Sequence, residues 1–205
     1  MSEQTINTVI FDLDDVLCDY DRNARIAHMA QTTALSSDAV IAAIWDSGFD
    51  DDADEGAYSA ADYLAETEMR LGHPISATQW ADARKAGMTP RPVVLEMASR
   101  IQARASLAGF TNNGPLMHQM IADIFPEAHE LFGDRLFFSY DIGLAKPDPK
   151  AYLAVLEIIG AKPRQTLFID DNEGYVLGAA AAGLHVHRYI DADSLAHQLR
   201  NFGLL

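Results

Sequence analysis

Cysteine and positive charge are both scarce in this chain of 205 residues. Cys18 is its one cysteine, so no disulfide can form within the chain, which fits a reducing compartment. The 15 lysine and arginine residues are outnumbered by 30 aspartates and glutamates, which gives a formal net charge of −15. Such a field repels nucleic acid and anionic lipid, and we expect neither as a partner. A small anionic ligand stays compatible with the sequence, because one local cation or bound metal outweighs the distant field.

Long hydrophobic runs are also missing. No apolar stretch approaches the ~20 residues of a membrane span, and Met1–Gln4 lacks the basic region that opens a signal peptide. We therefore expect a cytoplasmic protein with no membrane partner. Hydrophobic residues still make up 49 % of the chain, which excludes disorder as its main state and is enough for a core.

Apolar runs and helical patterns alternate along most of the chain. Thr8–Phe11 is a short, continuous apolar run, which is typical of a buried strand in a parallel sheet. From about residue 23 to residue 86 the pattern is helical, with capping signals at Ser59 and Ser76 and an acidic turn at 50–56. The later strands are expected at 106–110, 136–139, 166–169 and 185–188. The later helices are expected at 93–104, 115–125, 149–159, 173–182 and 192–201.

This alternation predicts an α/β fold with right-handed crossovers and a mostly parallel sheet of about five strands flanked by helices. The first strand is separated from the others by the long helical segment. We therefore expect an α/β core of residues 1–18 and 88–205, with an α-helical cap of residues 19–87 inserted after strand one. The alanine-rich stretch at 178–183 is interpreted as close packing of a helix against the sheet.

Polar residues follow four of the expected strands. Ligands of open α/β sheets bind outside the carboxyl ends of the strands, so these residues are the first candidates for a site. They are Asp12, Asp14, Thr111, Asn112, Lys146, Asp170 and Asp171.

The chemistry of this set favours phosphoryl transfer. Several carboxylates in one crevice repel one another and need a counter-charge. Oxygen ligands without nearby Cys or His favour a hard divalent cation, Mg²⁺ first, which also takes phosphate oxygens as ligands. The Lys146 ammonium and the Thr111 hydroxyl suit the remaining phosphate oxygens. One carboxylate of an Asp-x-Asp pair can attack phosphorus while the other exchanges a proton with the leaving group and with water.

Four short motifs, in order along nearly the whole chain, resemble those of the haloacid dehalogenase superfamily of hydrolases. They are the Phe-Asp-Leu-Asp-Asp-Val-Leu of residues 11–17, the Thr-Asn-Asn of 111–113, the Lys146 segment of 143–149 and the Phe-Ile-Asp-Asp-Asn of 168–172. The position of the helical insertion resembles the subgroup with a C1-type cap. The Asp-Asp-Asn ending and the Asp-Tyr-Asp of 19–21 look closest to small sugar-phosphate phosphatases and to the phosphatase domain of soluble epoxide hydrolases. The resemblance implies a Rossmann-like core.

The resemblance also implies roles for the acidic residues. Asp12 would be the nucleophile and Asp14 the general acid and base. Mg²⁺ would be held by Asp12, the backbone carbonyl of Asp14, and Asp171. Asp170 would bind the ion directly or through water, although capping of the following helix is an alternative role for it.

The other two motifs would bind the phosphoryl group. Thr111 and Lys146 would orient it, and the backbone at Asn112 would add a donor. The sequence departs from the superfamily at Asp15, where glycine is frequent. A side chain there would narrow the site or add charge near the phosphate.

The function predicted on this basis is Mg²⁺-dependent hydrolysis of a small phosphorylated metabolite, with a sugar phosphate as one candidate, through an aspartyl-phosphate intermediate. Three alternatives stay open: a 2-haloacid dehalogenase, a phosphomutase, and a binding protein that keeps the fold without turnover. Dehalogenases generally lack the second aspartate of the first motif, so Asp14 favours the phosphatase. The protein is expected to be a monomer or a homodimer.

Residues of the expected cap are harder to assign. Trp45 and Trp80 fit core packing or the substrate entrance, and the acidic run near residues 50–55 fits a solvated loop or a loop that reaches the site. Arg22 and Arg25, with Asp21, lie near the hinge and fit either substrate contact or solvent exposure.

Two further features look structural. The His-x-His of residues 185–187 is interpreted as an ordinary strand end rather than a metal pair. Cys18 is interpreted as a small buried residue, because no paired base is evident for a nucleophile.

Overall fold

A parallel five-stranded sheet forms the centre of the molecule in this computed structural model, which describes residues 5–205. The N-terminal Met1–Gln4, where no basic leader was expected, lies outside the described residues. The strand order is β5-β4-β1-β6-β7, and every neighbouring pair in this sheet is parallel. The strands are β1 (Thr8–Phe11), β4 (Ser106–Thr111), β5 (Leu136–Phe138), β6 (Thr166–Asp170) and β7 (His185–Arg188). The predicted α/β fold with five parallel strands is confirmed.

The central position of β1 determines where polar residues gather. Phe11, its last residue, is in register with Gly109 of β4 and Ile169 of β6. Because all three strands run in the same direction, the residues that follow them meet at one edge of the sheet.

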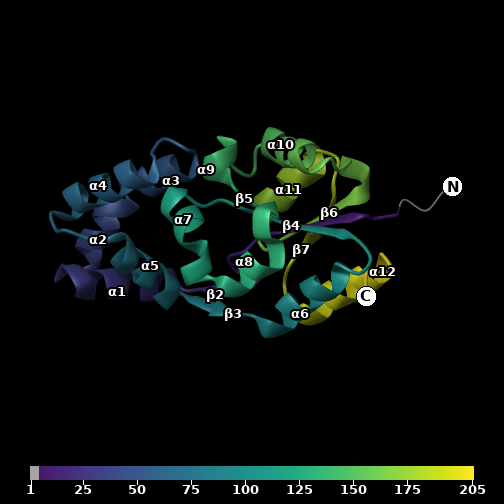
Figure 1. Cartoon of the computed structure of the whole chain (residues 1–205), viewed down its shortest axis with the longest axis horizontal. Coiled ribbons are helices and arrows are strands. Elements are labelled where there is room, and N and C mark those ends of the chain that lie inside the picture. Colours follow the sequence, from purple (N-terminus) through teal and green to yellow (C-terminus); the bar gives the residue numbers. More distant parts are fainter. Residues whose placement is uncertain (1–4) are drawn as a thin grey trace.

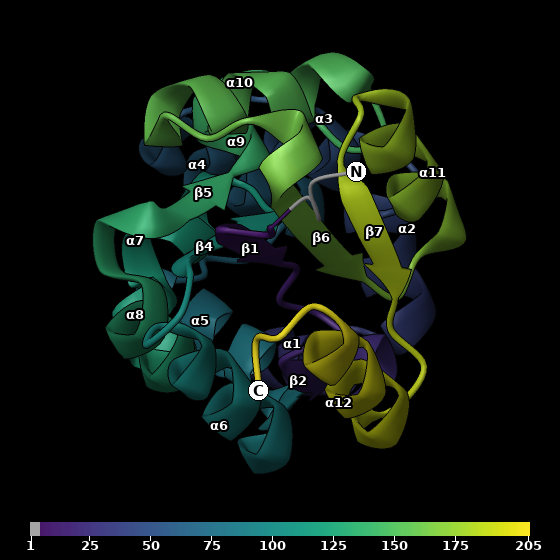
Figure 2. The ribbon, with the colours of Figure 1, turned by 90° about the vertical axis from the view of Figure 1, so that its right-hand side faces the viewer.

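Helices cover both faces of the sheet, as Figure 2 shows with α10 above the strands and α6 and α12 below them. Alternate residues of β1 serve the two faces: Val9 and Phe11 belong to one apolar cluster and Ile10 to the other. The flanking helices are α6 (Pro92–Ile101), α7 (Pro115–Ile124), α8 (Pro126–Phe132), α10 (Pro149–Ile159), α11 (Glu173–Ala181) and α12 (Ala192–Asn201). Shorter elements are η1 (Gly133–Arg135), α9 (Ser139–Ile142) and η2 (Pro163–Gln165).

Five of the helices between β1 and β4 form a separate group, here named the α1–α5 bundle, at one end of the molecule (Figure 1). They are α1 (Arg22–Thr33), α2 (Ser37–Ile44), α3 (Phe49–Asp54), α4 (Ala60–Leu71) and α5 (Ala77–Ala86). The expected capping signals are present, since Ser59 accepts a hydrogen bond from the Asp62 N–H and Ser76 forms a reciprocal capping box with Gln79.

A short antiparallel ribbon joins the bundle to the sheet. It pairs β2 (Cys18–Tyr20) with β3 (Met88–Pro90), so the chain enters and leaves the bundle side by side. This ribbon was not predicted from the sequence, because strands of three residues have too little periodicity to be recognised.

Two further elements differ from expectation. The acidic turn expected at 50–56 is largely the helix α3, whose Phe49 and Ala53 are buried one turn apart. The helix α8 was missed because Phe125 leaves the helical backbone region after α7 and Pro126 then starts a new helix at its first position.

The alanine-rich helix α11 packs closely, as expected. Ala179 belongs to a buried cluster with the sheet, and a Cβ on Gly178 would lie 2.2 Å from the carbonyl oxygen of Pro147. His185 and His187 lie on β7, where the first packs against the Phe202 ring and the second lies 3.4 Å from the Ser194 hydroxyl.

Candidate active site

The loop after β1 begins with a buried carboxylate. Asp12 is 6 % exposed, and its N–H donates a hydrogen bond to the Ile169 carbonyl of β6. The chain then turns sharply, with Asp15 at φ 58°, the left-handed region that glycine adopts most readily and aspartate tolerates. The Asp15 carboxylate accepts a hydrogen bond from the Tyr20 N–H at 3.1 Å. At the position where the superfamily often has glycine, this side chain therefore stabilises the start of the β2–β3 ribbon.

Three of the predicted metal ligands converge. Oxygen atoms of Asp12, Asp170 and Asp171 all lie within 4.8 Å of one another, and the first two residues are buried. Asp170 is not the helix cap that the sequence left as an alternative, because the Asn172 side chain caps α11. This donor set of carboxylate oxygens fits a hard divalent cation. The Asp14 carboxylate points elsewhere, which agrees with a metal contact through its backbone only.

Lys146 supplies the one buried ammonium of this cluster. Its Nζ lies 2.7 Å from Asp170 Oδ2 and 2.9 Å from Asp12 Oδ1. Burial opposes a charge there, but the Asp12 and Asp170 carboxylates raise the pKa of Lys146 above its ordinary value, so it remains protonated. The Asn112 side chain fixes its backbone, donating to the Lys146 carbonyl at 2.9 Å and accepting from its N–H at 3.0 Å. The Asn112 side chain therefore positions Lys146, a role that the sequence did not indicate.

The positive charge near Asp12 does not offset the cost of burying its carboxylate. Burial raises its pKa to about 8; Lys146 opposes this rise, and the Asp170 and Asp14 carboxylates add to it. Asp12 Oδ1 has no hydrogen-bond partner of good geometry, although it lies beside Lys146. A carboxylate in this state needs either a proton or a further cation, which is the second reason that the cluster fits a divalent metal.

Thr111 ends β4 and begins a network that leads to Asp14. Its hydroxyl accepts a hydrogen bond from Asn113 Nδ2 at 2.7 Å, and the same amide group lies 3.3 Å from Asp14 Oδ2. Arg84 completes the network, since its Nη2 lies 2.5 Å from Asp14 Oδ2 and 3.1 Å from Asn113 Oδ1. Asp14 is therefore held by one residue of the sheet edge and one of the α1–α5 bundle.

Arg84 is the residue that sequence reasoning missed most completely. It lies on α5, is 1 % exposed, and its guanidinium lies over the Tyr20 ring at 4.0 Å. Its pKa is raised, because the attraction of Asp14 and Tyr20 outweighs burial. No local signal identifies it, since arginine on a helix most often faces solvent. Asn113, in contrast, belongs to the Thr-Asn-Asn motif and could have been singled out there.

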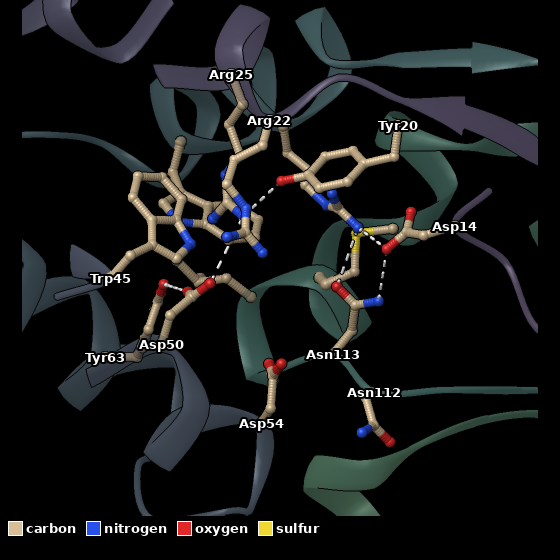
Figure 3. A pocket seen from close by; sticks show the side chains of 15 residues that line it. Asp14, Tyr20, Arg22, Arg25, Trp45, Asp50, Asp54, Tyr63, Asn112 and Asn113 are labelled. Carbon is tan, nitrogen blue, oxygen red and sulfur yellow. Dashed lines mark hydrogen bonds and ion pairs between the residues drawn. The ribbon is translucent and has the colours of Figure 1, made fainter. Parts of the chain in front are cut away.

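A cavity of about 100 Å³ lies between the α1–α5 bundle and the loops after β1 and β4 (Figure 3). Asp14, Asn112 and Asn113 line its core side. Lining residues from the ribbon and the bundle are Tyr20, Arg22, Arg25, Trp45, Asp50, Asp54, Tyr63, Trp80 and Arg84. Asp12, Asp170 and Asp171 do not line it, so the cavity adjoins the carboxylate cluster on the side of Asp14.

The cavity bears on several alternatives that the sequence left open. Trp45 and Trp80 line it and also pack with the core, and Arg22 and Arg25 line it as well.

The acidic segment reaches the cavity through Asp50 and Asp54, while Asp51, Asp52 and Glu55 are exposed to solvent. Asp21 caps α1 instead, accepting hydrogen bonds from the N–H groups of Asn23 and Ala24. Cys18 is buried, as expected.

Known proteins share sequence with most of this chain. A family model described as haloacid dehalogenase-like hydrolase matches residues 6–183. The phosphatase MT3486 of Mycobacterium tuberculosis (strain CDC 1551 / Oshkosh) is 29 % identical over 199 residues, covering 89 % of this chain and 87 % of that protein. A chloroplast flavin mononucleotide hydrolase of Arabidopsis thaliana is 38 % identical over 68 residues, but these cover only 33 % of this chain and 28 % of that protein.

Solved structures show the same fold. The HAD family enzyme BT-2542 of Bacteroides thetaiotaomicron superposes with a TM-score of 0.80 at 21 % identity, covering 96 % of this chain and 99 % of that one. The L-2-haloacid dehalogenase of Xanthobacter autotrophicus superposes with a TM-score of 0.63 at 21 % identity, covering 98 % and 85 %. No helix of residues 5–205 is long and apolar enough to cross a membrane. With its family match over most of the chain, this protein belongs to the haloacid dehalogenase-like hydrolases.

Proposed function

We propose that this hydrolase is a Mg²⁺-dependent phosphatase that cleaves the monoester of a small phosphorylated metabolite, such as a sugar phosphate, in the cytoplasm. The observation that carries the proposal is the carboxylate cluster of Asp12, Asp170 and Asp171, in which the buried Lys146 pairs with the first two. The similarity to a protein named phosphatase over most of both chains supports it.

The residues divide the reaction between them. Asp12 attacks phosphorus, forming an aspartyl phosphate and breaking the bond to the leaving oxygen, which takes a proton from Asp14. Asp14 then removes a proton from water, whose oxygen attacks phosphorus and releases phosphate and the Asp12 carboxylate. Lys146 and Thr111 bind the phosphoryl oxygens. Mg²⁺, held by Asp12, Asp171, the Asp14 carbonyl and Asp170, would neutralise the carboxylates and the phosphoryl charge when bound.

We further propose that residues 19–87, with the α1–α5 bundle, act as a cap that excludes bulk water and selects the leaving group. Its place over Asp14 supports this, because the cavity that the bundle closes is where a group leaving toward Asp14 would lie. The cap would then contribute Arg84 to the site.

The test is phosphate release from p-nitrophenyl phosphate and a panel of metabolite monoesters, with Mg²⁺ and with EDTA. Asp12→Asn removes the nucleophile with little change in shape and should abolish release, whereas Glu157→Gln, an exposed change on α10, is the matched control and should not. Release that survives in Asp12→Asn would refute the mechanism.

A protein that releases no phosphate from any ester would refute the phosphatase proposal itself. The next substrates would then be 2-haloacids, since Asp12 attack on carbon needs neither Mg²⁺ nor a leaving-group proton. The dehalogenase of similar fold supports that alternative only at the level of the fold.

A further inference from the structure

Arg25 of α1 is a buried cation with free hydrogen-bonding capacity in the cavity. It is 5 % exposed, and its guanidinium lies against the rings of both Trp45 and Trp80, 5.1 Å from each centroid. Its Nη1 donates a hydrogen bond to the Tyr20 hydroxyl at 3.2 Å and lies 3.8 Å from Asp50 Oδ2. Its Nε and Nη2 have no partner.

The two unpaired nitrogens form a matched pair. Nε and Nη2 lie on the same edge of the planar guanidinium, so their N–H groups run parallel, in the fork that binds two oxygens of a carboxylate or a phosphate. The two indole rings pack against the guanidinium and hold it in place. A buried charged donor left unpaired is costly, so this edge needs an acceptor from outside the chain, either a ligand or water.

Other unpaired groups in the cavity are also donors. Among residues 5–205, the buried unpaired side-chain atoms that line it are the Arg25 pair, Trp80 Nε1 and Arg84 Nε, and none of these is an acceptor. Two of the three carboxyl groups that line the cavity are already engaged: Asp50 accepts a hydrogen bond from the Tyr63 hydroxyl at 2.7 Å, and Asp14 accepts one from Arg84. The third, Asp54, forms no hydrogen bond with the unpaired donors, so these remain available to an oxygen-rich ligand.

The charged side chains that line the cavity also favour an anionic ligand. Three arginines, Arg22, Arg25 and Arg84, line this one cavity in a protein whose net charge is −15. Burial, and then the neighbouring Asp50 carboxylate, raise the pKa of Asp54 well above its ordinary value, which favours the neutral form of this carboxyl group and weakens its competition for the arginines.

We propose that this cavity is a subsite for a leaving group that carries its own anionic group, a carboxylate or a second phosphate, bound side-on by the Nε–Nη2 edge of Arg25 beside Trp45 and Trp80. The proposal rests on the phosphatase function and names its substrate class: short phosphomonoesters with a second anion. Figure 3 shows Asp14 and Arg25 on either side of the Tyr20 side chain in that view, so the ester oxygen would lie at Asp14 and the anion at Arg25. A cavity of about 150 Å³ holds benzene, so this one of about 100 Å³ suits about three carbons.

Three phosphomonoesters with the same three-carbon chain test the proposal. Glycerol 3-phosphate has a neutral leaving group, 3-phosphoglycerate adds a carboxylate, and glycerol 1,3-bisphosphate adds a second phosphate. The wild-type protein should show a kcat/KM for at least one anionic ester that is roughly a hundredfold above that for glycerol 3-phosphate, because a site built for a polar group rejects the analogue that lacks it. The better of the two anionic esters identifies the group. Equal kcat/KM values for all three would overturn the proposal.

Variants of Arg25 then test whether this side chain causes the preference for anionic esters. Arg25→Gln should lower kcat/KM for the preferred anionic ester by roughly a hundredfold and should change kcat/KM for glycerol 3-phosphate much less, so that the preference is lost. Arg25→Lys retains the charge and packing but not the fork, so it should lose most of the preference while staying folded by thermal unfolding. Arg70→Gln removes an exposed cation of the same bundle and is the control. A preference that survives in both Arg25 variants would overturn the proposal.

A binding measurement separates this proposal from the phosphatase proposal. Trp45 and Trp80 are the two tryptophans of the chain, so intrinsic fluorescence reports on this cavity. Glycerate should change the fluorescence saturably, glycerol should not, and Arg25→Gln should abolish the change. If no ester is hydrolysed but glycerate binds in this way, the phosphatase function fails and the anion subsite stands. If p-nitrophenyl phosphate is hydrolysed but glycerate does not bind, the subsite is refuted and the phosphatase stands.

Discussion

The ion pair between Arg84 and Asp14 provides a direct test of how the α1–α5 bundle is attached to the catalytic edge of the sheet. Arg84→Met removes the charge and keeps most of the buried hydrocarbon volume. Breaking a buried ion pair costs about 3–5 kcal/mol. The Asp14 side chain is 23 % exposed, so water in the cavity partly solvates the carboxylate left behind. We therefore expect the low end of that range, about 3 kcal/mol, or a Tm lower by about 6–12 °C for a chain of this length.

A double-mutant cycle isolates the pair from the other contacts of Arg84. Urea unfolding of the wild type, Arg84→Met, Asp14→Asn and the double variant should give a coupling free energy of about 2 kcal/mol. Arg70→Met is the matched control, because its ion pair with Glu66 spans one helical turn near the surface and should contribute less than about 0.5 kcal/mol. A coupling below about 0.5 kcal/mol for the Arg84–Asp14 pair would show that the bundle does not hold this contact in solution and would refute the reasoning.

Three further predictions concern other parts of the fold. Gly178→Ala should lower stability by about 1–3 kcal/mol in urea unfolding, because the new Cβ meets the Pro147 carbonyl next to Lys146, and unchanged stability would contradict that close approach. Cys18 should resist 5,5′-dithiobis(2-nitrobenzoate) at pH 8 until the protein is unfolded, since burial raises the pKa of its thiol, and fast reaction of the native protein would contradict this. Burial lowers the pKa of His187, so its stabilising effect is complete above about pH 6.5 and is lost as the pH falls. His187→Gln should therefore unfold with a midpoint that depends less on pH between pH 7 and pH 5, and an unchanged pH profile would exclude the effect.

The sequence was sufficient to predict the parallel sheet and the acidic residues at the carboxyl ends of its strands. Thr8–Phe11 and the later apolar runs are continuous because both faces of a parallel sheet are covered, and this pattern is visible without a structure. Once the strands are parallel, Asp12 and Asp170 must lie close together, because β1 and β6 are neighbours and their carboxyl ends lie at one edge. Lys146 follows β5 and α9, so only the tertiary structure brings it to these two carboxylates. Short elements were not predictable in this way: the β2–β3 ribbon and α3 are held by contacts with the rest of the molecule rather than by their own periodicity.

Only the tertiary structure decided what closes the site. Hydrophobic periodicity shows which side of a helix is buried, but it cannot show which neighbour the buried side meets, and it assigns arginine to solvent. Arg84 is 70 positions away from Asp14 in the chain and still forms an ion pair with it. Arg25 likewise becomes a buried donor because Trp45, at the end of α2, and Trp80, on α5, pack against it. The local sequence determined the acidic residues at the carboxyl ends of β1 and β6, whereas the packing of the α1–α5 bundle determined which side chains line the cavity beside them, because those contacts form between helices that are distant in the chain.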